Sequence, residues 1–161
     1  MNAKSKVLAL KYRPQTFDQL IGQKVIAESI FNSIKNNKLP NAYIFLGIRG
    51  SGKTSMARIV AKALNCENGV EKLCKDNLCD NCKSIVEGNN IDILEIDAAS
   101  KTGVDDVREL IEFSRYKPTS AKYKIFICDE VHMFSKSAFA ALLKTLEEPP
   151  SYLKFIFAST D

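Results

Sequence analysis

The sequence lacks any apolar stretch that approaches the roughly 20 residues needed to cross a membrane. It also lacks a signal-peptide pattern, because no apolar run of sufficient length follows the basic residues in Met1–Lys6. Internal repeats and low-complexity tracts are missing as well. These absences exclude a membrane-spanning protein and argue against export. We therefore expect a cytoplasmic protein with no membrane partner.

Composition predicts a single compact domain. The 161 residues are 45% hydrophobic, which is enough to bury a core, and we expect one nucleotide-binding domain over residues 1–161. The net charge of +4 is mild. A nucleic-acid surface would need the Lys and Arg residues clustered on one face, so charge permits DNA as a partner without arguing for it.

The most informative motif has the spacing of a phosphate-binding loop. It is Gly47-Ile48-Arg49-Gly50-Ser51-Gly52-Lys53-Thr54, preceded by an apolar, strand-like segment and followed by a helix-like one. Glycines let such a loop turn and bring N–H groups close to phosphates, and the helix N-terminus adds a positive dipole. We expect Lys53 to reach the β- and γ-phosphates and Thr54 to hold Mg²⁺. By itself the octet is also compatible with an ordinary Gly-rich turn.

A second site downstream favours nucleotide binding. An apolar run over 124–128 ends in Asp129-Glu130. A carboxylate at the tip of a buried strand can hold the water shell of Mg²⁺, and its neighbour can polarise an attacking water. Both halves of an ATP site are therefore predicted, in the right order along the chain.

Strand-like and helix-like segments alternate, which indicates a parallel sheet with helices on both faces, an α/β sandwich of three layers. We expect Thr102 to cap the helix near 104–116 with Asp105 bonding back, and Ser135 to cap the next helix, which Pro149-Pro150 ends. The predicted strands are 42–46, 92–96, 124–129 and 154–159, and the predicted helices lie near 24–37, 53–65, 104–116 and 136–147.

The chain stops at Asp161, directly after the last apolar strand. The helix and further strand that would complete a sheet of this type do not follow, so we expect a fragment of a longer protein.

Four of the five cysteines are clustered in a polar insertion over 66–82, in the pattern C-x7-C-x4-C-x2-C: Cys66, Cys74, Cys79 and Cys82. Four thiolates close in sequence suit a tetrahedral Zn²⁺ site, and a cytoplasmic address disfavours disulfides. The single histidine, His132, is distant in sequence, so we expect a closed, structural zinc site; reduced free thiols are the alternative. Cys128 is expected to be a small buried residue of a strand.

Together, several motifs resemble the gamma/tau subunit family of bacterial DNA polymerase III, the AAA+ ATPases of the clamp loader. The resemblance covers nearly the whole chain and rests on Lys11-Tyr12-Arg13-Pro14, Phe17, Leu20-Ile21-Gly22-Gln23, the phosphate loop, the cysteine insertion, Asp97-Ala98-Ala99-Ser100-Lys101, Asp129-Glu130-Val131-His132-Met133 and Leu142-Leu143-Lys144-Thr145-Leu146-Glu147-Glu148-Pro149-Pro150. The family commonly has x2 where this chain has x4 between Cys74 and Cys79.

The resemblance implies a role for each matching position. Asp129 would position Mg²⁺, Glu130 would activate water, and Thr160 would read the γ-phosphate. Adenine would be lined by Tyr12, Arg13 and Pro14, and the phosphates would be held by Gly47, Ile48, Arg49, Gly50, Ser51, Gly52, Lys53, Thr54 and Ser55. The family's arginine finger, second arginine sensor, lid and collar would lie beyond Asp161. We therefore expect this chain alone to bind ATP weakly and to hydrolyse it poorly.

As a family member, the protein would work with other clamp-loader subunits, a sliding clamp and primed DNA. DNA would be held by its backbone, and Lys101-Thr102 and Ser135-Lys136 are candidate contacts, although ordinary solvated helix caps would have the same sequence.

Two other functions remain open. Asp129-Glu130-Val131-His132 also resembles the box of a superfamily 2 helicase, which would need a second motor domain. The second alternative is a degenerate clamp-loader subunit with only a structural role. The presence of Lys53, Thr54, Asp129 and Glu130 argues against it. His132 is expected to be packed or hydrogen-bonded, because Glu130 already supplies the base.

Overall fold

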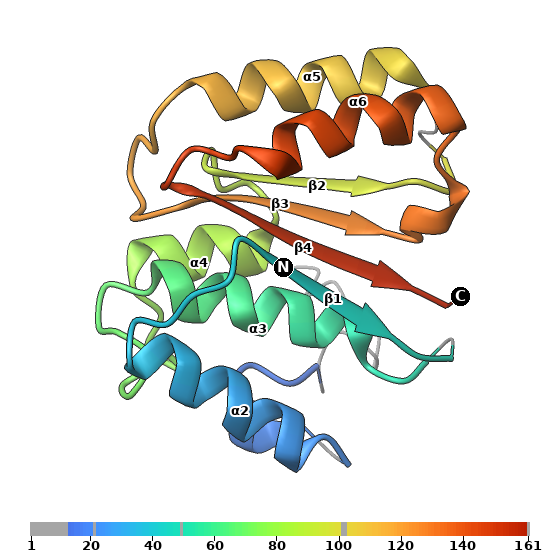
Figure 1. Ribbon diagram of the computed structural model, residues 1–161. Coiled ribbons are helices and arrows are strands. Elements are labelled where there is room, and N and C mark those ends of the chain that lie inside the picture. The colour runs from blue at the N-terminus through green and yellow to red at the C-terminus, as the bar shows by residue number, and fades with distance from the viewer. Residues whose placement is uncertain (1–12, 21, 49, 101–102, 161) are drawn as a thin grey trace, which may run out of the picture.

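The computed structural model describes residues 13–20, 22–48, 50–100 and 103–160. Its elements are, in chain order, η1 (Phe17–Gln19), α2 (Lys24–Lys35), β1 (Ala42–Leu46), α3 (Lys53–Asn65), α4 (Asp80–Glu87), β2 (Ile93–Asp97), α5 (Val104–Arg115), β3 (Lys124–Asp129), η2 (Val131–Met133), α6 (Lys136–Glu147) and β4 (Leu153–Ser159). The strands form a parallel sheet in the order β1-β4-β3-β2 (Figure 1). All four predicted strands and all four predicted helices are confirmed to within about two residues.

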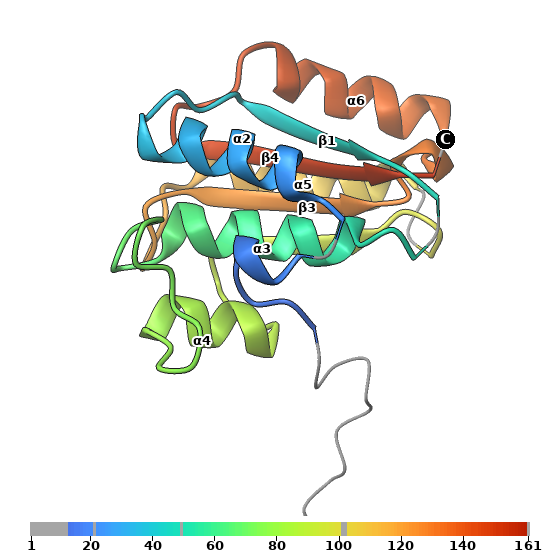
Figure 2. The same ribbon diagram turned by 90° about the horizontal axis from the view of Figure 1, so that it is seen from below.

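Helices cover both faces of the sheet, which confirms the predicted three-layer α/β architecture. Helices α5 and α6 lie on one face of the sheet, and α2 and α3 lie on the other (Figure 1). Figure 2 shows the molecule from the side of α2 and α3. Strand β3 serves both layers because successive side chains point to opposite faces. Ile125 and Ile127 pack toward α2 and α3, whereas Phe126 and Cys128 pack toward α5 and α6.

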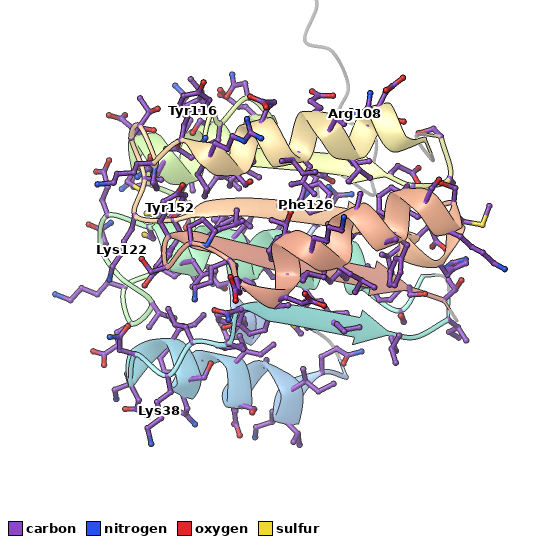
Figure 3. All side chains as sticks on the ribbon, turned by 45° about the horizontal axis from the view of Figure 1, so that its top comes forward. Lys38, Arg108, Tyr116, Lys122, Phe126 and Tyr152 are labelled. Atoms are coloured by element: carbon purple, nitrogen blue, oxygen red, sulfur yellow. The ribbon has the colours of Figure 1, made fainter. Side chains whose placement is uncertain are left out.

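Aromatic rings fill the layer under α5 and α6. Phe126, labelled in Figure 3, is fully buried and makes edge-to-face contacts with Phe155 and Phe157 at centroid distances of 6.1 and 6.4 Å. Tyr152 extends this layer, since its hydroxyl donates to the carbonyl of Ser114 on α5 over 2.7 Å. The cysteine of β3, Cys128, is fully buried as expected.

The helix caps are partly as predicted. Ser135 accepts a hydrogen bond from the backbone N–H of Ala138 over 3.2 Å, and α6 ends at Glu147 before the two prolines. For α5 the prediction about Asp105 is wrong. The residue that bonds back is Asp106, whose Oδ2 accepts from the Gly103 N–H over 3.2 Å, because Gly103 is the N-cap and Asp106 is the third residue after it. The expected cap at Thr102 falls outside the described residues.

One α-helix and the two short 3-10 helices, η1 and η2, were not predicted. Helix α4 begins at Asp80 near the end of the cysteine insertion, extends to Glu87 and packs against α3 (Figure 2). None of the helices in the described ranges is long and apolar enough to span a membrane.

Candidate nucleotide-binding site and cysteine cluster

The carboxyl ends of the parallel strands meet at one edge of the sheet. The register pairs Leu46 with Ser159 and Asp97 with Asp129, so β1, β4, β3 and β2 end side by side. Open α/β sheets bind their ligands at this edge. The two predicted halves of the nucleotide site lie here, one after β1 and one at the end of β3.

The loop between β1 and α3 has a backbone that requires glycine at two positions. Gly52, the N-cap of α3, has a φ of 90°, in the region that only glycine adopts readily. Gly50 has a φ of 82°, in the same region, so a side chain at either position would be strained. The buried hydroxyl of Ser51 has no hydrogen-bond partner among the described residues. A tight loop with an unpaired polar group, at a helix N-terminus, fits a phosphate group. Arg49 lies outside the described residues.

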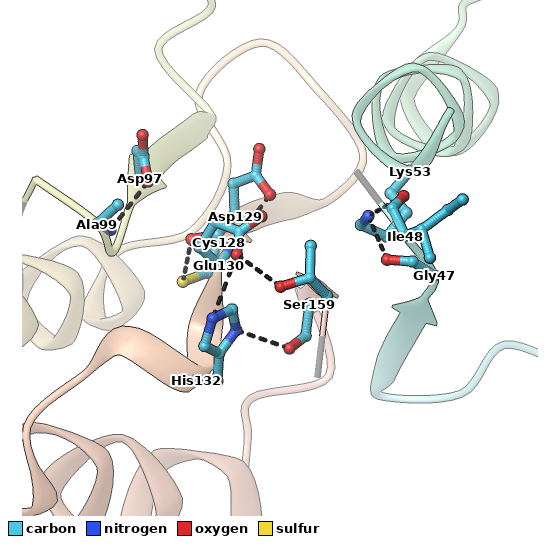
Figure 4. A network of polar contacts seen from close by, with 11 residues as sticks. Gly47, Ile48, Lys53, Asp97, Ala99, Cys128, Asp129, Glu130, His132 and Ser159 are labelled. Carbon is cyan, nitrogen blue, oxygen red and sulfur yellow. Dashed lines mark hydrogen bonds and ion pairs between the residues drawn. The ribbon is translucent and has the colours of Figure 1, made fainter. Parts of the chain in front are cut away.

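Lys53 is folded onto this loop. Its Nζ donates to the carbonyl oxygens of Gly47 and Ile48 over 2.6 and 2.9 Å (Figure 4). These two carbonyl groups thus hold the ammonium group of Lys53 at the loop. There the ammonium group can donate to phosphate oxygens in place of the carbonyl oxygens.

Thr54 and Asp129 bring the two predicted halves into contact. The hydroxyl of Thr54 donates to Asp129 Oδ2 over 3.1 Å. The other oxygen, Oδ1, accepts from the backbone N–H of Glu130 over 3.0 Å, which fixes the carboxylate (Figure 4). A hydroxyl and a carboxylate oxygen are ligands that Mg²⁺ prefers.

Glu130 lies beside Thr160, as the sequence-based roles require. Oε2 of Glu130 accepts a hydrogen bond from Thr160 Oγ1 over 3.2 Å and lies 3.3 Å from His132 Nε2. His132 is hydrogen-bonded, as expected, through Nδ1 to Ser159 Oγ over 2.8 Å (Figure 4). Its contact with the predicted base was not anticipated, although its position two residues after Glu130 was a usable signal.

The predicted adenine-binding residues are not brought to the phosphate loop. Arg13 and Pro14 line a cavity of about 290 Å³ between α3 and α4, together with Arg58, Ile59, Lys62, Ile85, Val86 and Glu87 among others. Burial, with a smaller contribution from Arg58, lowers the pKa of Arg13. Tyr12 lies outside the described residues.

A different cavity, also of about 290 Å³, adjoins the loop, and neither Arg13 nor Pro14 lines it. It lies between α2, β1 and the start of α3, and its lining includes Gln23, Ile26, Ile30, Tyr43, Ser51, Gly52 and Lys53. Gln23 joins the two sides, since its Nε2 donates to the carbonyl of Ser51 over 3.3 Å. This contact of Gln23 with the loop was not predicted, although Gln23 belongs to a motif that carried the resemblance.

The four clustered cysteines converge despite their unusual spacing. The four Sγ atoms of Cys66, Cys74, Cys79 and Cys82 all lie within 4.8 Å of one another. The Cys66 sulfur lies 3.6 Å from that of Cys74 and 4.0 Å from that of Cys79. Cys79 also caps α4, because its sulfur accepts from the N–H of Cys82 over 3.4 Å.

The thiols of the cluster differ in pKa. At Cys74 burial raises the pKa, but hydrogen bonds from the Cys79 N–H and from neighbouring thiols outweigh it and lower the value to about 7. At Cys82 burial dominates and raises the pKa. Hydrogen bonds to Cys74 thus favour its thiolate, the form that binds metals.

A buried lysine connects the cluster with the phosphate-loop helix. Lys62 on α3 is only 2% exposed. Its Nζ donates to the Gln15 carbonyl over 2.8 Å, to Gln15 Oε1 over 3.2 Å and to the Cys74 carbonyl over 3.0 Å. Burial lowers the pKa of Lys62, against the opposing effect of the nearby thiols. Sequence analysis missed this role, because a lysine inside an apolar helical run gives no indication of its partners.

Of the candidate DNA contacts, Ser135 and Lys136 lie exposed at the N-terminus of α6. Lys101 and Thr102 lie outside the described residues.

Comparison with known proteins identifies relatives. A family model described as DNA polymerase III, delta subunit, matches residues 22–161. The DNA polymerase III subunit tau/gamma of Haemophilus influenzae is 53% identical over 157 residues, which cover 97% of this chain and 22% of that protein. The DNA polymerase III subunit gamma of Buchnera aphidicola subsp. Baizongia pistaciae is 48% identical over 156 residues, or 96% of this chain and 42% of that protein. The chain thus spans less than half the length of either relative.

Solved structures show the same fold. The RuvB Holliday junction branch migration motor of Thermotoga maritima superposes with a TM-score of 0.60 at 17% identity, covering 92% of this chain and 42% of RuvB. A DNA polymerase III gamma subunit-related protein from Thermotoga maritima gives 0.52 at 22% identity, covering 83% of this chain and 38% of the other. At these identities the likeness concerns the fold alone, and it agrees with the expected α/β fold with a parallel sheet.

The family model and the two relatives confirm the resemblance to gamma/tau subunits. The chain belongs to the family of DNA polymerase III subunits that the model describes.

Proposed function

We propose that this chain is the ATP-binding and ATP-hydrolysing part of a cytoplasmic clamp-loader subunit, which loads a sliding clamp onto primed DNA during replication. The observation that carries the proposal is the hydrogen bond between Thr54 and Asp129, which joins the phosphate loop to the end of β3. A glycine-rich loop alone would fit many phosphate-containing ligands. A loop joined to a carboxylate at a strand tip fits a nucleoside triphosphate with its bound metal ion.

The residues have separate tasks in hydrolysis. The loop N–H groups and Lys53 hold the phosphates, while Thr54 and Asp129 would hold Mg²⁺, which neutralises charge on the phosphate oxygens. Glu130 accepts a proton from a water molecule as that water attacks the γ-phosphorus. The bond to the β–γ bridging oxygen breaks, and ADP and phosphate leave. Thr160 contacts the γ-phosphate and reports its presence.

The cysteine cluster is proposed to hold a structural Zn²⁺. Tetrahedral coordination with Zn–S bonds of about 2.3 Å places sulfurs about 3.8 Å apart. The observed separations of 3.6 and 4.0 Å are close to that value. Four thiolates leave no open position, so the metal stabilises the insertion and takes no part in hydrolysis. Metal analysis of the purified chain is expected to find one zinc per chain, and its absence from protein prepared with zinc would contradict the assignment.

The proposed partners are other clamp-loader subunits, the sliding clamp and primed DNA. Support comes from the relatives, which are named as subunits of a polymerase, and from Lys136 at an exposed helix N-terminus, a geometry that favours phosphate contacts.

The test is ATP hydrolysis by the assembled complex. We expect primed DNA and sliding clamp together to stimulate turnover strongly, and each alone to stimulate it weakly. Stimulation by single-stranded DNA without any dependence on the clamp would instead support a helicase. Turnover that is unaffected by Lys53→Ala in this chain would support a purely structural subunit.

A further inference from the structure

We propose that His132 is a positioning residue for ATP hydrolysis, which holds the Glu130 carboxylate and couples it to the end of β4. The inference rests on the proposed function, because it requires Glu130 to act as the base. It adds a residue that the roles implied by the sequence do not include.

The imidazole of His132 lies between two groups of the site. Nε2 lies 3.3 Å from Glu130 Oε2, and Nδ1 lies 2.8 Å from Ser159 Oγ (Figure 4). The side chains of His132 and Glu130 are 28% and 27% exposed, so their contact is partly shielded from water. A contact of this kind is stronger than one at an open surface.

The partners of the ring determine where its proton lies. If Nε2 carried no proton, its lone pair would face a carboxylate oxygen, which is unfavourable. A neutral ring with its proton on Nε2 would direct that proton toward Glu130 Oε2, while Nδ1 would accept from the hydroxyl of Ser159. The carboxylate of Glu130 thus favours the tautomer that can hold the base, and the hydroxyl of Ser159, which can donate or accept, is compatible with it.

The backbone around His132 keeps the ring in place. Glu130 adopts a left-handed conformation, with a φ of 55°, and η2 follows it directly. The N–H of Met133 donates to the Glu130 carbonyl over 2.9 Å. Phe134, the next residue, is buried in the core under α6. The turn that carries His132 is therefore anchored at both ends.

Thr160 makes the contact sensitive to nucleotide. Its hydroxyl has one proton, which it donates to Glu130 Oε2 over 3.2 Å in this structure. A hydroxyl that donates to a γ-phosphate oxygen cannot donate the same proton to Glu130. When ATP engages Thr160, His132 is left as the side chain that holds the carboxylate. Ser159, adjacent to Thr160, anchors the ring to the strand end that meets the phosphate.

Loss of His132 should therefore affect turnover and leave ATP binding intact. Small misplacements of a catalytic group reduce rates by about 100-fold in other enzymes, and we expect His132→Ala to lower kcat about 10- to 100-fold. His132→Gln retains an N–H donor that can reach Glu130, so it should recover most of the lost rate. Met133→Ala, on the same turn, is the matched control and should leave the rate unchanged.

The kinetic experiment compares these variants in the assembled complex, with affinity measured by a fluorescent ATP analogue. A fall of about tenfold or more in kcat for His132→Ala, with affinity within about twofold of the unmodified protein and recovery in His132→Gln, supports the proposal. A smaller fall, a parallel loss of affinity or no recovery would overturn it. If the unmodified complex hydrolyses ATP no faster than its Glu130→Gln variant, the proposed function fails, which is a separate outcome.

A second measurement needs no turnover. The chain contains one histidine, so its imidazole nitrogens give a single set of NMR signals. We expect the signals to show a proton on Nε2, and we expect them to change in Glu130→Ala and on addition of ATP with Mg²⁺. A ring protonated mainly on Nδ1, or signals unaffected by Glu130→Ala, would overturn the proposal.

Discussion

Thr54 donates a hydrogen bond to Asp129 across 75 positions of sequence, and this contact joins the phosphate-binding loop to the end of β3. It follows from the sheet order, in which β4 alone separates β1 from β3 and all carboxyl ends lie at the same edge. The contact brings a hydroxyl and a carboxylate oxygen together at this edge of the sheet.

The first prediction concerns this pair. Thr54→Val removes the hydroxyl but keeps the shape of the side chain, and it should weaken binding of ATP in the presence of Mg²⁺ by about tenfold or more, the loss of about one charge-assisted contact. Binding in the presence of EDTA should change little, because the hydroxyl acts through the metal. Thr145→Val on α6 is the matched control. Equal losses with and without Mg²⁺ would show that Thr54 contacts the phosphates alone.

The second prediction concerns Lys62. Lys62→Met keeps the volume of the side chain but leaves the carbonyls of Gln15 and Cys74 without their donor, and these contacts are inside the protein. Unsatisfied buried groups cost about 1–3 kcal/mol each, so we expect the free energy of unfolding to fall by about 2 kcal/mol or more. Urea unfolding measures the change. Lys83→Met, on the exposed surface of α4, should be neutral.

The third prediction concerns zinc. Cys82→Ser, or a strong chelator, should remove the metal and lower Tm by about 10 °C, since a closed metal site contributes several kcal/mol to folding. Cys128→Ala is the control, because this fifth cysteine is buried in β3, away from the cluster. It should retain one zinc per chain even though it loosens the core. Loss of zinc in Cys128→Ala but not in Cys82→Ser would contradict the assignment.

The fourth prediction concerns DNA. Lys136→Glu at the N-terminus of α6 should weaken the DNA-dependent part of ATP hydrolysis and reduce its dependence on salt, because each phosphate contact adds to the salt slope. Lys144→Glu is the matched control, because it makes the same change of charge in the last turn of α6, away from the N-terminus of the helix. If the two variants behave alike, Lys136 is an ordinary surface lysine.

Much of the fold could be predicted from sequence because its strands are continuous apolar runs, as expected for strands covered on both faces. Helix α4 was missed because it is short, has few apolar residues and has a cysteine, Cys79, as its cap. The hydrogen bond predicted for the side chain of Asp105 is made by Asp106. The reason is that the N-cap of α5 is Gly103, one residue after the predicted cap, Thr102.

The site was predictable where the topology determines it. The meeting of Thr54 with Asp129, and of Glu130 with Thr160, follows from parallel strands that end at one edge. The contacts of Gln23 and Lys62 were not predictable, because each depends on how side chains from separate segments pack. The contact of His132 with Glu130 was missed, although the two residues are only two positions apart. The roles of Arg13 and Pro14 at adenine stay a prediction, since they lie apart from the cavity beside the loop.

The central claim is that this chain hydrolyses ATP with Glu130 as the base. The most direct measurement is ATP binding and hydrolysis by the assembled complex with clamp and primed DNA, compared between the unmodified protein and Glu130→Gln in this chain. The account predicts that Glu130→Gln binds ATP with unchanged affinity and loses about 100-fold or more of the turnover that depends on this chain. Unchanged turnover in Glu130→Gln would contradict it.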